Sequence, residues 1–266
     1  MLVGGLEYIK NVSEVIDCLC MVPFESWEAL IELDPEYKYF KKFKTKLTCG
    51  QFSVLLLMAG LNAYQLKGYA EKAYWSKLSE YISKFETPST PTDLSELLVG
   101  FYGSERLPKG KLKRITRFLG SDLAKRLWKQ DGKTIEKDFE QIGKDLAKVM
   151  NQKSFDKTIC FAMKCLAISL LLYGYADFNF SMPIPVDSRI LRWTNRLGLC
   201  DGENKVEIQQ VWNKILQGLK DHDSRLNMIH LDCLLWQTAV LENEELICFF
   251  NKCGGTKVAE FFANKK

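Results

Sequence analysis

The sequence predicts an all-α protein, and three observations support this fold class. Apolar residues recur at helical spacing along most of the 266 residues, and no convincing strand pattern is present. Hydrophobic residues make up 47% of the chain and charged residues 26%, which is the balance of an ordinary globular protein. A chain of this length can bury one large core or two modest ones, so we expect a single domain, 1–266, built as two helical lobes.

The individual helices follow from apolar periodicity and from the residues that begin and end each segment. They are expected at 6–20, 48–66, 69–85, 94 onward, 109–118, 133–150, 157–176, 188–197, 207–219, 232–241 and 244–250. The Thr- and Pro-rich segment 87–93 interrupts the pattern and is the candidate break between the lobes. Asp93 is placed to cap the helix that begins at Leu94. Gly198 is placed to end the expected helix 188–197.

Two short segments have open interpretations. The segment Lys109–Phe118 reads Lys-Gly-Lys-Leu-Lys-Arg-Ile-Thr-Arg-Phe and carries five basic residues. Such runs usually form a solvated helix face, and contact with phosphate groups is the functional alternative. The link 151–156 precedes the helix that starts at Lys157, and either Ser154 or Asp156 could cap that helix.

Charge and cysteine content exclude several classes of protein. The formal net charge of +4 is compatible with an anionic partner without requiring one. The nine cysteines are scattered through apolar helical segments, where free cysteine behaves as a small hydrophobic residue, so we expect a reducing, cytoplasmic setting. Glu7 and Lys10 interrupt the only apolar start, so no secretory signal is expected. Only two histidines and no Cys-x-x-Cys pair are present, so we expect no metal site.

The apolar run 159–176 is close to the ~20 residues that span a bilayer. Lys164 lies inside it, and a lysine at the centre of an inserted helix costs roughly 2.5–3.5 kcal/mol. Gly174 and Asp177 then close the run. We therefore expect a buried core helix and no association with a membrane.

This core helix begins with a constellation that suggests chemistry. Lys157, Phe161 and Lys164 are spaced so that two amines and a phenyl ring share one helix face. The positive end of the helix dipole disfavours the Lys157 cation, and a nucleophilic lysine must be neutral. Lys164 has apolar neighbours, so it either extends to solvent or faces a polar cavity, and we favour the cavity.

Two further segments supply carboxylates. Asp187 follows two prolines in Pro-Ile-Pro-Val-Asp-Ser-Arg-Ile and is a good N-cap for the next helix. A capping carboxylate stays ionised. An ionised carboxylate can stabilise the positive charge that develops on a sugar when a glycosidic bond breaks. Asp232 and Trp236 lie one helical turn apart, where an acceptor and an indole could bind a planar heterocycle. A core tryptophan beside a surface aspartate is the plainer interpretation of that pair.

Three motifs in order resemble one known family. Lys-Thr-Ile-Cys-Phe-Ala-Met-Lys, Pro-Ile-Pro-Val-Asp-Ser-Arg-Ile and His-Leu-Asp-Cys-Leu-Leu-Trp together resemble the archaeal GO glycosylases of the AGOG type. These are 8-oxoguanine DNA glycosylase/lyases of the helix-hairpin-helix superfamily. The segment Cys49-Gly-Gln51-Phe extends the likeness into the N-terminal half.

The resemblance implies two helical lobes with a hairpin-like, DNA-binding region at about 133–176 beside the active-site cleft. It implies that Lys157 is the nucleophile and Asp187 the catalytic aspartate. It also implies a set of substrate-binding residues: Phe161 and Trp236 for stacking, and Lys164, Asp232, Gln51 and Trp75 for further contacts with the base.

Two departures from the superfamily pattern are visible. The Gly-x-Gly hairpin is replaced by Asn-Gln-Lys-Ser-Phe-Asp at 151–156, which matches the unusual hairpin of the archaeal branch. The four-cysteine iron–sulfur loop of the endonuclease III relatives is absent, since Cys233, Cys248 and Cys253 have the wrong spacing. We therefore expect no cofactor.

The implied partner is double-stranded DNA containing 8-oxoguanine, bound by a monomer. The base is flipped and stacked, an acceptor at Gln51 distinguishes its N7 hydrogen, and Lys157 forms a Schiff base that leads to strand cleavage by β-elimination. A glycosylase for another damaged purine remains an alternative. A non-enzymatic DNA-binding module using 109–117 and a helical interaction scaffold are the alternatives from other classes.

Overall fold

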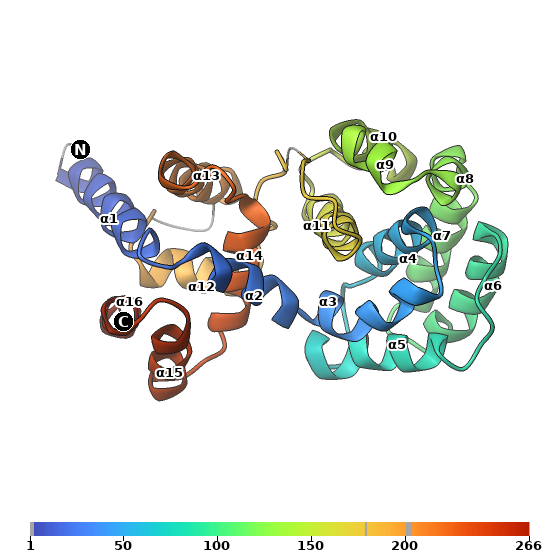
Figure 1. The fold of residues 1–266 in the computed structure, drawn as a ribbon, viewed down its shortest axis with the longest axis horizontal. Coiled ribbons are helices and arrows are strands. Elements are labelled where there is room, and N and C mark those ends of the chain that lie inside the picture. The colour runs from blue at the N-terminus through green and yellow to red at the C-terminus, as the bar shows by residue number, and fades with distance from the viewer. Residues whose placement is uncertain (1–2, 179, 201–203, 266) are drawn as a thin grey trace. The chain divides into compact units, whose positions relative to one another are not determined.

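The structure, a computed structural model, describes residues 3–178, 180–200 and 204–265, and within these ranges every regular element is helical (Figure 1). The predicted all-α class is therefore confirmed. The chain divides into two compact units, the first formed by Met1–Asp34 with Met182–Lys266 and the second by Pro35–Ser181. The segment 87–93, where we expected the break between lobes, instead lies inside the second unit and joins two of its helices.

The first unit combines both ends of the chain. Its helices are α1 (Val3–Leu19), α2 (Phe24–Leu33), α12 (Ser188–Arg196), α13 (Lys205–His222), α14 (Met228–Thr238), α15 (Asn243–Cys253) and α16 (Thr256–Asn264). α1 packs on α13 and α16, and α14 packs on α2, α12 and α13.

Buried tryptophans fix α12 against its neighbours in this unit. Trp193 on α12 donates from Nε1 to Oγ1 of Thr238 on α14 at 3.0 Å. Trp212 on α13 donates in the same way to Thr194 at 2.9 Å. Both indole N–H groups are buried and paired, as buried donors must be, so the positions of α12 and α14 are set together.

The second unit is continuous in sequence. Its elements are α3 (Pro35–Phe40), the 3₁₀ turn η1 (Lys41–Thr45), α4 (Cys49–Leu61), the π-helical η2 (Ala70–Trp75), α5 (Ser76–Ile82), α6 (Pro91–Tyr102), α7 (Pro108–Leu119), α8 (Asp122–Lys129), α9 (Gly132–Lys137), α10 (Phe139–Met150) and α11 (Lys157–Leu172). Sequence periodicity did not predict α2, α3, α8 or α16, which are short or lack a long apolar stripe.

Some predicted helices differ in their limits. α6 begins at Pro91, and its N-cap is Thr90, whose side chain accepts from the backbone N–H of Asp93 at 3.1 Å. Asp93 is the third helical residue and returns a bond to the Thr90 N–H, so it completes a capping box rather than capping the helix itself. The expected helix 133–150 is two helices that meet at Asp138, and the expected helix 69–85 is divided between η2 and α5.

The core of the second unit is the pair of helices α4 and α11. Both are apolar around most of their circumference, which is typical of helices buried on all sides. Ser53 and Ser169 share a hydrogen bond of 2.8 Å, while Gly60 lies against Ala162 and Cys165. These contacts show that the two helices are antiparallel, so the start of α11 lies beside the end of α4.

Within the part of the chain that the structure describes, no helix combines the length and the apolar character needed to cross a lipid bilayer. The apolar run near Lys164 forms α11, which has only 16 residues and is enclosed by protein. The expectation of a core helix is confirmed.

Candidate active site

The first feature of the site is the exposed amine at the start of α11. α10 ends at Asn151, which adopts a left-handed conformation with φ of 53°, and Gln152 N–H then bonds back to Ala147 O at 2.9 Å. The link 151–156 therefore turns the chain sharply into α11, so α10, the link and α11 form a helix–turn–helix pair. Lys157 is the first residue of α11 and its side chain is exposed.

Asp156 occupies the N-cap position of α11, as one of the two predicted alternatives. Its carboxylate does not cap the helix, because Oδ2 instead accepts from the backbone N–H of Lys153 at 3.0 Å within the link. The aspartate thus shapes the turn. The backbone N–H groups at the start of α11 keep their positive potential beside Lys157.

Phe161 and Lys164 follow on the same helix, as the spacing predicted. The Nζ of Lys164 lies 5.8 Å from the centroid of the Phe161 ring. Lys164 is only 1% exposed, so it does not extend to solvent, while Phe161 is half-buried. A buried ammonium beside an aromatic ring is a strong feature for binding a polar, planar group.

Trp75 joins this group from η2. Its ring centroid lies 6.4 Å from that of Phe161, and it also makes edge contacts with Phe40 and Tyr74. The side chain is fully buried. A π-helical turn is uncommon and often marks a functional position, and here it directs Trp75 toward α11. The structure thus brings Trp75, Phe161 and Lys164 together.

Gln51 is not part of this group. It lies at the start of α4, where its Oε1 accepts from the Thr48 N–H at 2.9 Å in a capping box. The neighbouring Phe52 contacts Tyr173 at the far end of α11, with ring centroids 5.6 Å apart. Phe161 precedes Tyr173 by twelve residues, or about 18 Å along a helix axis. The antiparallel packing of α4 and α11 therefore separates Gln51 from Phe161, contrary to the sequence-based assignment.

Gln51 instead lines a different pocket of the second unit. Its other walls come from side chains of η1, α4, α5, α6 and α8 and from the 83–88 segment, including Phe43, Ile82, Leu94 and Trp128. The walls are mostly apolar.

Asp187 is the N-cap of α12 in the first unit, as predicted. Its Oδ1 accepts from the N–H groups of Arg189 at 2.9 Å and Ile190 at 3.1 Å. The preceding segment 182–186 is buried, and Ile184 O accepts from Gln209 Nε2 at 3.2 Å. Two prolines limit the backbone in this segment, so the carboxylate is held in a defined direction.

Asp232 and Trp236 lie on α14 of the same unit. Asp232 is buried and Trp236 is half-buried, so the alternative of a surface aspartate is wrong. The guanidinium of Arg189 lies over the Trp236 ring, with Cζ 3.7 Å from the ring centroid, and its Nη1 donates to Trp236 O at 3.0 Å. Sequence reasoning gave Arg189 no role, because 47 residues separate it from Trp236 and no local pattern links them.

In the described ranges 3–178, 180–200 and 204–265, no group of three His, Cys, Asp or Glu side chains is arranged to hold a metal ion. The candidate catalytic groups are the amine of Lys157 and the carboxylate of Asp187. Lys157, Phe161, Lys164 and Trp75 belong to the second unit, and Asp187, Asp232 and Trp236 belong to the first.

Comparison with known proteins places the chain in a family. The family model for AGOG, N-glycosylase/DNA lyase, matches residues 16–259. The N-glycosylase/DNA lyase of Methanopyrus kandleri is 28% identical over 206 residues, which cover 77% of this chain and 79% of that protein. The corresponding protein of Methanococcus maripaludis is 27% identical over 212 residues, covering 77% and 78%.

A solved structure has the same fold. The crystal structure of an 8-oxoguanosine-complexed AGOG, an 8-oxoguanine DNA glycosylase from Pyrobaculum aerophilum, matches with a TM-score of 0.73 at 23% identity over 96% of both chains. The family model covers most of the sequence, including all three motifs, and this protein therefore belongs to the AGOG family of N-glycosylase/DNA lyases.

Proposed function

We propose that this N-glycosylase/DNA lyase removes 8-oxoguanine from double-stranded DNA and then cuts the strand through an imine on Lys157. The observation that carries the proposal is the arrangement on α11, where an exposed amine is followed by the Phe161 ring and the buried Lys164. The likeness to an AGOG structure solved with 8-oxoguanosine supports this choice of base.

Recognition of the base is assigned to both aromatic and charged side chains. Phe161 and Trp236 offer ring faces for the flipped purine, and stacking is worth roughly 1–3 kcal/mol per base. Lys164 and Asp232 supply a buried donor and a buried acceptor, and the low dielectric around buried groups strengthens their hydrogen bonds to a base that carries the matching groups. Trp75 packs against the Phe161 ring, with the two planes tilted by 52°.

In the proposed reaction, a bond from C1′ to the Lys157 nitrogen replaces the bond from C1′ to the base. The neutral Lys157 amine attacks C1′ of the deoxyribose while the C1′–N9 bond breaks and its electron pair leaves with the base. The ionised Asp187 stabilises the positive charge that develops on the sugar. Loss of the amine proton and ring opening give the Schiff base. Removal of a C2′ proton then breaks the C3′–O bond, which cuts the strand 3′ to the lesion.

The α10–link–α11 unit is our candidate for the helix-hairpin-helix that holds the DNA backbone. Backbone N–H groups at the start of a helix favour phosphate, and the link leads directly to the start of α11. We further propose that the protein acts as a monomer and works on DNA in the cytoplasm. Membership of an enzyme family sets aside the non-enzymatic alternatives.

Borohydride trapping tests the function directly. The wild-type protein should form a covalent adduct with a duplex containing one 8-oxoguanine, and Lys157→Gln should form none while still binding the lesion. Lys252→Gln is the matched control, because Lys252 is an exposed lysine on α15, outside the proposed site and outside the α10–link–α11 unit. Equal trapping by Lys157→Gln and wild type would overturn the assignment of the nucleophile.

The choice of base is tested separately. Duplexes carrying guanine, 8-oxoguanine or an alkylated purine at the same position should differ, with single-turnover excision fastest for 8-oxoguanine. Faster excision of another damaged purine would contradict the assignment of 8-oxoguanine as the substrate, while the assignment of lyase chemistry to Lys157 would stand.

A further inference from the structure

The basic segment on α7 has two sides with different environments. Of its five basic residues, Lys111 is fully buried and Arg114 is half-buried, while Lys109, Lys113 and Arg117 are exposed. We call the three exposed residues the α7 basic face. They are spaced at intervals of four, so they lie in a row along one side of the helix.

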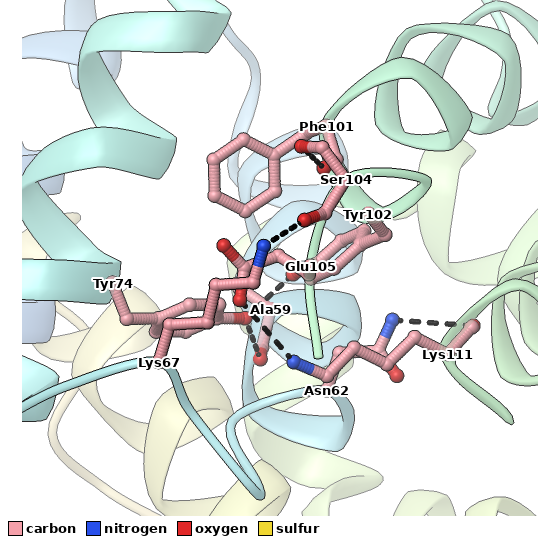
Figure 2. A network of polar contacts seen from close by, with 9 residues as sticks. All are labelled: Ala59, Asn62, Lys67, Tyr74, Phe101, Tyr102, Ser104, Glu105 and Lys111. Atoms are coloured by element: carbon pink, nitrogen blue, oxygen red, sulfur yellow. Dashed lines mark hydrogen bonds and ion pairs between the residues drawn. The ribbon is translucent and has the colours of Figure 1, made fainter. Parts of the chain in front are cut away.

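Lys111 anchors the inner side of α7 (Figure 2). Its Nζ lies 3.7 Å from Oε2 of Glu105 and 5.9 Å from the centroid of the Tyr102 ring. Its backbone O accepts from Asn62 Nδ2 at 3.3 Å, which ties α7 to the end of α4. Burial lowers the pKa of Lys111 more than the neighbouring Glu105 carboxylate raises it, and the charges of Lys67 and Arg114 act in the same direction as burial.

Two further contacts continue this anchor. Tyr102 shares a hydrogen bond of 2.5 Å with Tyr74, whose hydroxyl donates to Ala59 O on α4 at 2.6 Å (Figure 2). Arg114 stacks on Tyr64, with Cζ 4.1 Å from the ring centroid, and donates to Leu61 O. Lys111 and Arg114 thus prevent rotation of α7 about its axis, and this fixes the direction of the α7 basic face.

The α7 basic face carries no negative charge of its own. No acidic residue occurs between Arg106 and Gly120 in the sequence, and in the described ranges neither Lys109 nor Lys113 has an acidic partner. The exposed residues between the three cations are small, namely Gly110 and Thr116, so a flat partner could approach the helix closely.

The far end of the row meets the α10–link–α11 unit. Arg117 Nη1 donates to Met150 O, the last carbonyl of α10 before the link, at 3.0 Å. The cations of the α7 basic face therefore lead along the surface of the second unit to the turn that precedes Lys157. Residues four apart on a helix are about 6 Å apart along the axis, and successive phosphates of one DNA strand have a similar separation.

We propose that the α7 basic face binds consecutive phosphates of the duplex and delivers the strand to the link before Lys157. This inference rests on the proposed function, because it takes DNA to be the substrate. Each cation that neutralises a phosphate releases a counterion, so the surface should contribute to the salt dependence of binding whatever the base sequence.

The test is the salt dependence of binding to an undamaged duplex. Each phosphate contact contributes about 0.9 to the slope of log affinity against log salt, so Lys109→Gln with Lys113→Gln should lower the slope by about 1.8. Between 50 and 200 mM salt, the affinity of the wild type should then fall about tenfold more than that of the double variant. Both residues are exposed, so thermal unfolding should be unchanged.

Lys125→Gln with Lys129→Gln is the matched control. These two exposed lysines lie four residues apart on α8 in the same unit, so the variant has the same net charge as the first. The control should keep the wild-type slope. Equal slopes for the two double variants would overturn the proposal, because net charge alone would then explain the effect.

Trapping separates this outcome from a failure of the proposed function. If the wild type forms the borohydride adduct on the lesion duplex and the slopes are equal, only the α7 basic face is rejected. If the wild type neither traps nor binds any duplex, both proposals fail.

Discussion

The guanidinium of Arg189 covers one face of the Trp236 indole, with Cζ 3.7 Å from the ring centroid, and Nη1 donates to the carbonyl of the same residue. Trp236 is therefore held by a stacked cation and by a bond to its own backbone. Because Asp187 caps the helix by accepting from the Arg189 N–H, the proposed catalytic carboxylate and the support for the tryptophan lie on one turn of α12. The first turn of α12 therefore holds both the Asp187 carboxylate and the Arg189 side chain that supports Trp236.

Replacing Arg189 with alanine should weaken binding of the lesion while leaving the chemical step largely intact. A cation–π contact contributes about 0.5–2 kcal/mol, so we expect roughly a tenfold rise in the dissociation constant for the 8-oxoguanine duplex. Arg192→Ala is the control, since Arg192 donates to Ala239 O at 2.7 Å near the same end of α14. It loses a similar bond to a carbonyl, so equal losses of affinity in the two variants would contradict a role for the stacking.

Substitutions at Asp187 should separate its charge from its capping. Asparagine keeps an oxygen that can accept from the Arg189 and Ile190 N–H groups, so Asp187→Asn should be folded, with base excision at least 100-fold slower. Alanine removes the cap as well and should lower the free energy of unfolding by about 0.5–2 kcal/mol. Urea unfolding and single-turnover excision measure the two effects. Full activity of Asp187→Asn would leave Asp187 as a cap only.

Gly60→Ala should loosen the packing of α4 on α11. A Cβ at Gly60 would lie 2.8 Å from Cys165 Sγ and 3.0 Å from Ala162 Cα. Overpacking of this kind costs about 1–3 kcal/mol, which exceeds or matches the gain of about 1 kcal/mol in helix propensity. We expect a net loss of about 1 kcal/mol in urea unfolding. Adding Cys165→Ala should restore only part of it, because the Ala162 backbone cannot rotate away.

Stability should fall in mild acid because of His230. Burial lowers the pKa of His230 to about 4, so the folded protein keeps this ring neutral while the unfolded chain protonates it near pH 6.5. The unfolded state then binds more protons between these pH values, and the free energy of unfolding decreases as pH falls through this window, by on the order of 3 kcal/mol.

His230→Gln should remove most of this pH dependence. Nδ1 of His230 accepts from the Asn227 N–H at 3.1 Å at the start of α14, and glutamine can take the same capping role. Urea unfolding at pH 7 and pH 4.5 measures the difference, with the exposed His222→Gln as control. If the free energy of unfolding of His230→Gln fell between pH 7 and pH 4.5 as much as that of the wild type, a group other than His230 would cause the acid sensitivity.

The sequence predicted correctly those features that depend on neighbours along the chain. The spacing of Lys157, Phe161 and Lys164 decides which helix face they share, because the pitch of an α-helix is fixed. The capping role of Asp187 follows equally from its place before the polar start of α12, since the cap bonds reach only two and three residues ahead. The all-α class followed from the period of the apolar residues.

The local sequence pattern could not predict a structural feature where several conformations were compatible with the same pattern. Thr90 and Asp93 are both good capping residues, and only the start of α6 at Pro91 decides which is the cap. The basic run on α7 gives no sign that Lys111 and Arg114 point inward, because burial of a cation depends on Glu105 and on the rings of Tyr64 and Tyr102.

Contacts between distant segments were decided only by the tertiary structure. The sequence by itself determined that Trp236 and Asp232 share a helix face, but the fold alone brings Arg189 over the indole, from 47 residues away. In the same way, Gln51 matched a motif, and the antiparallel packing of α4 on α11 then carried it away from Phe161. Helical periodicity specifies a direction around one axis, whereas the register and orientation of two packed helices depend on the shapes of both surfaces.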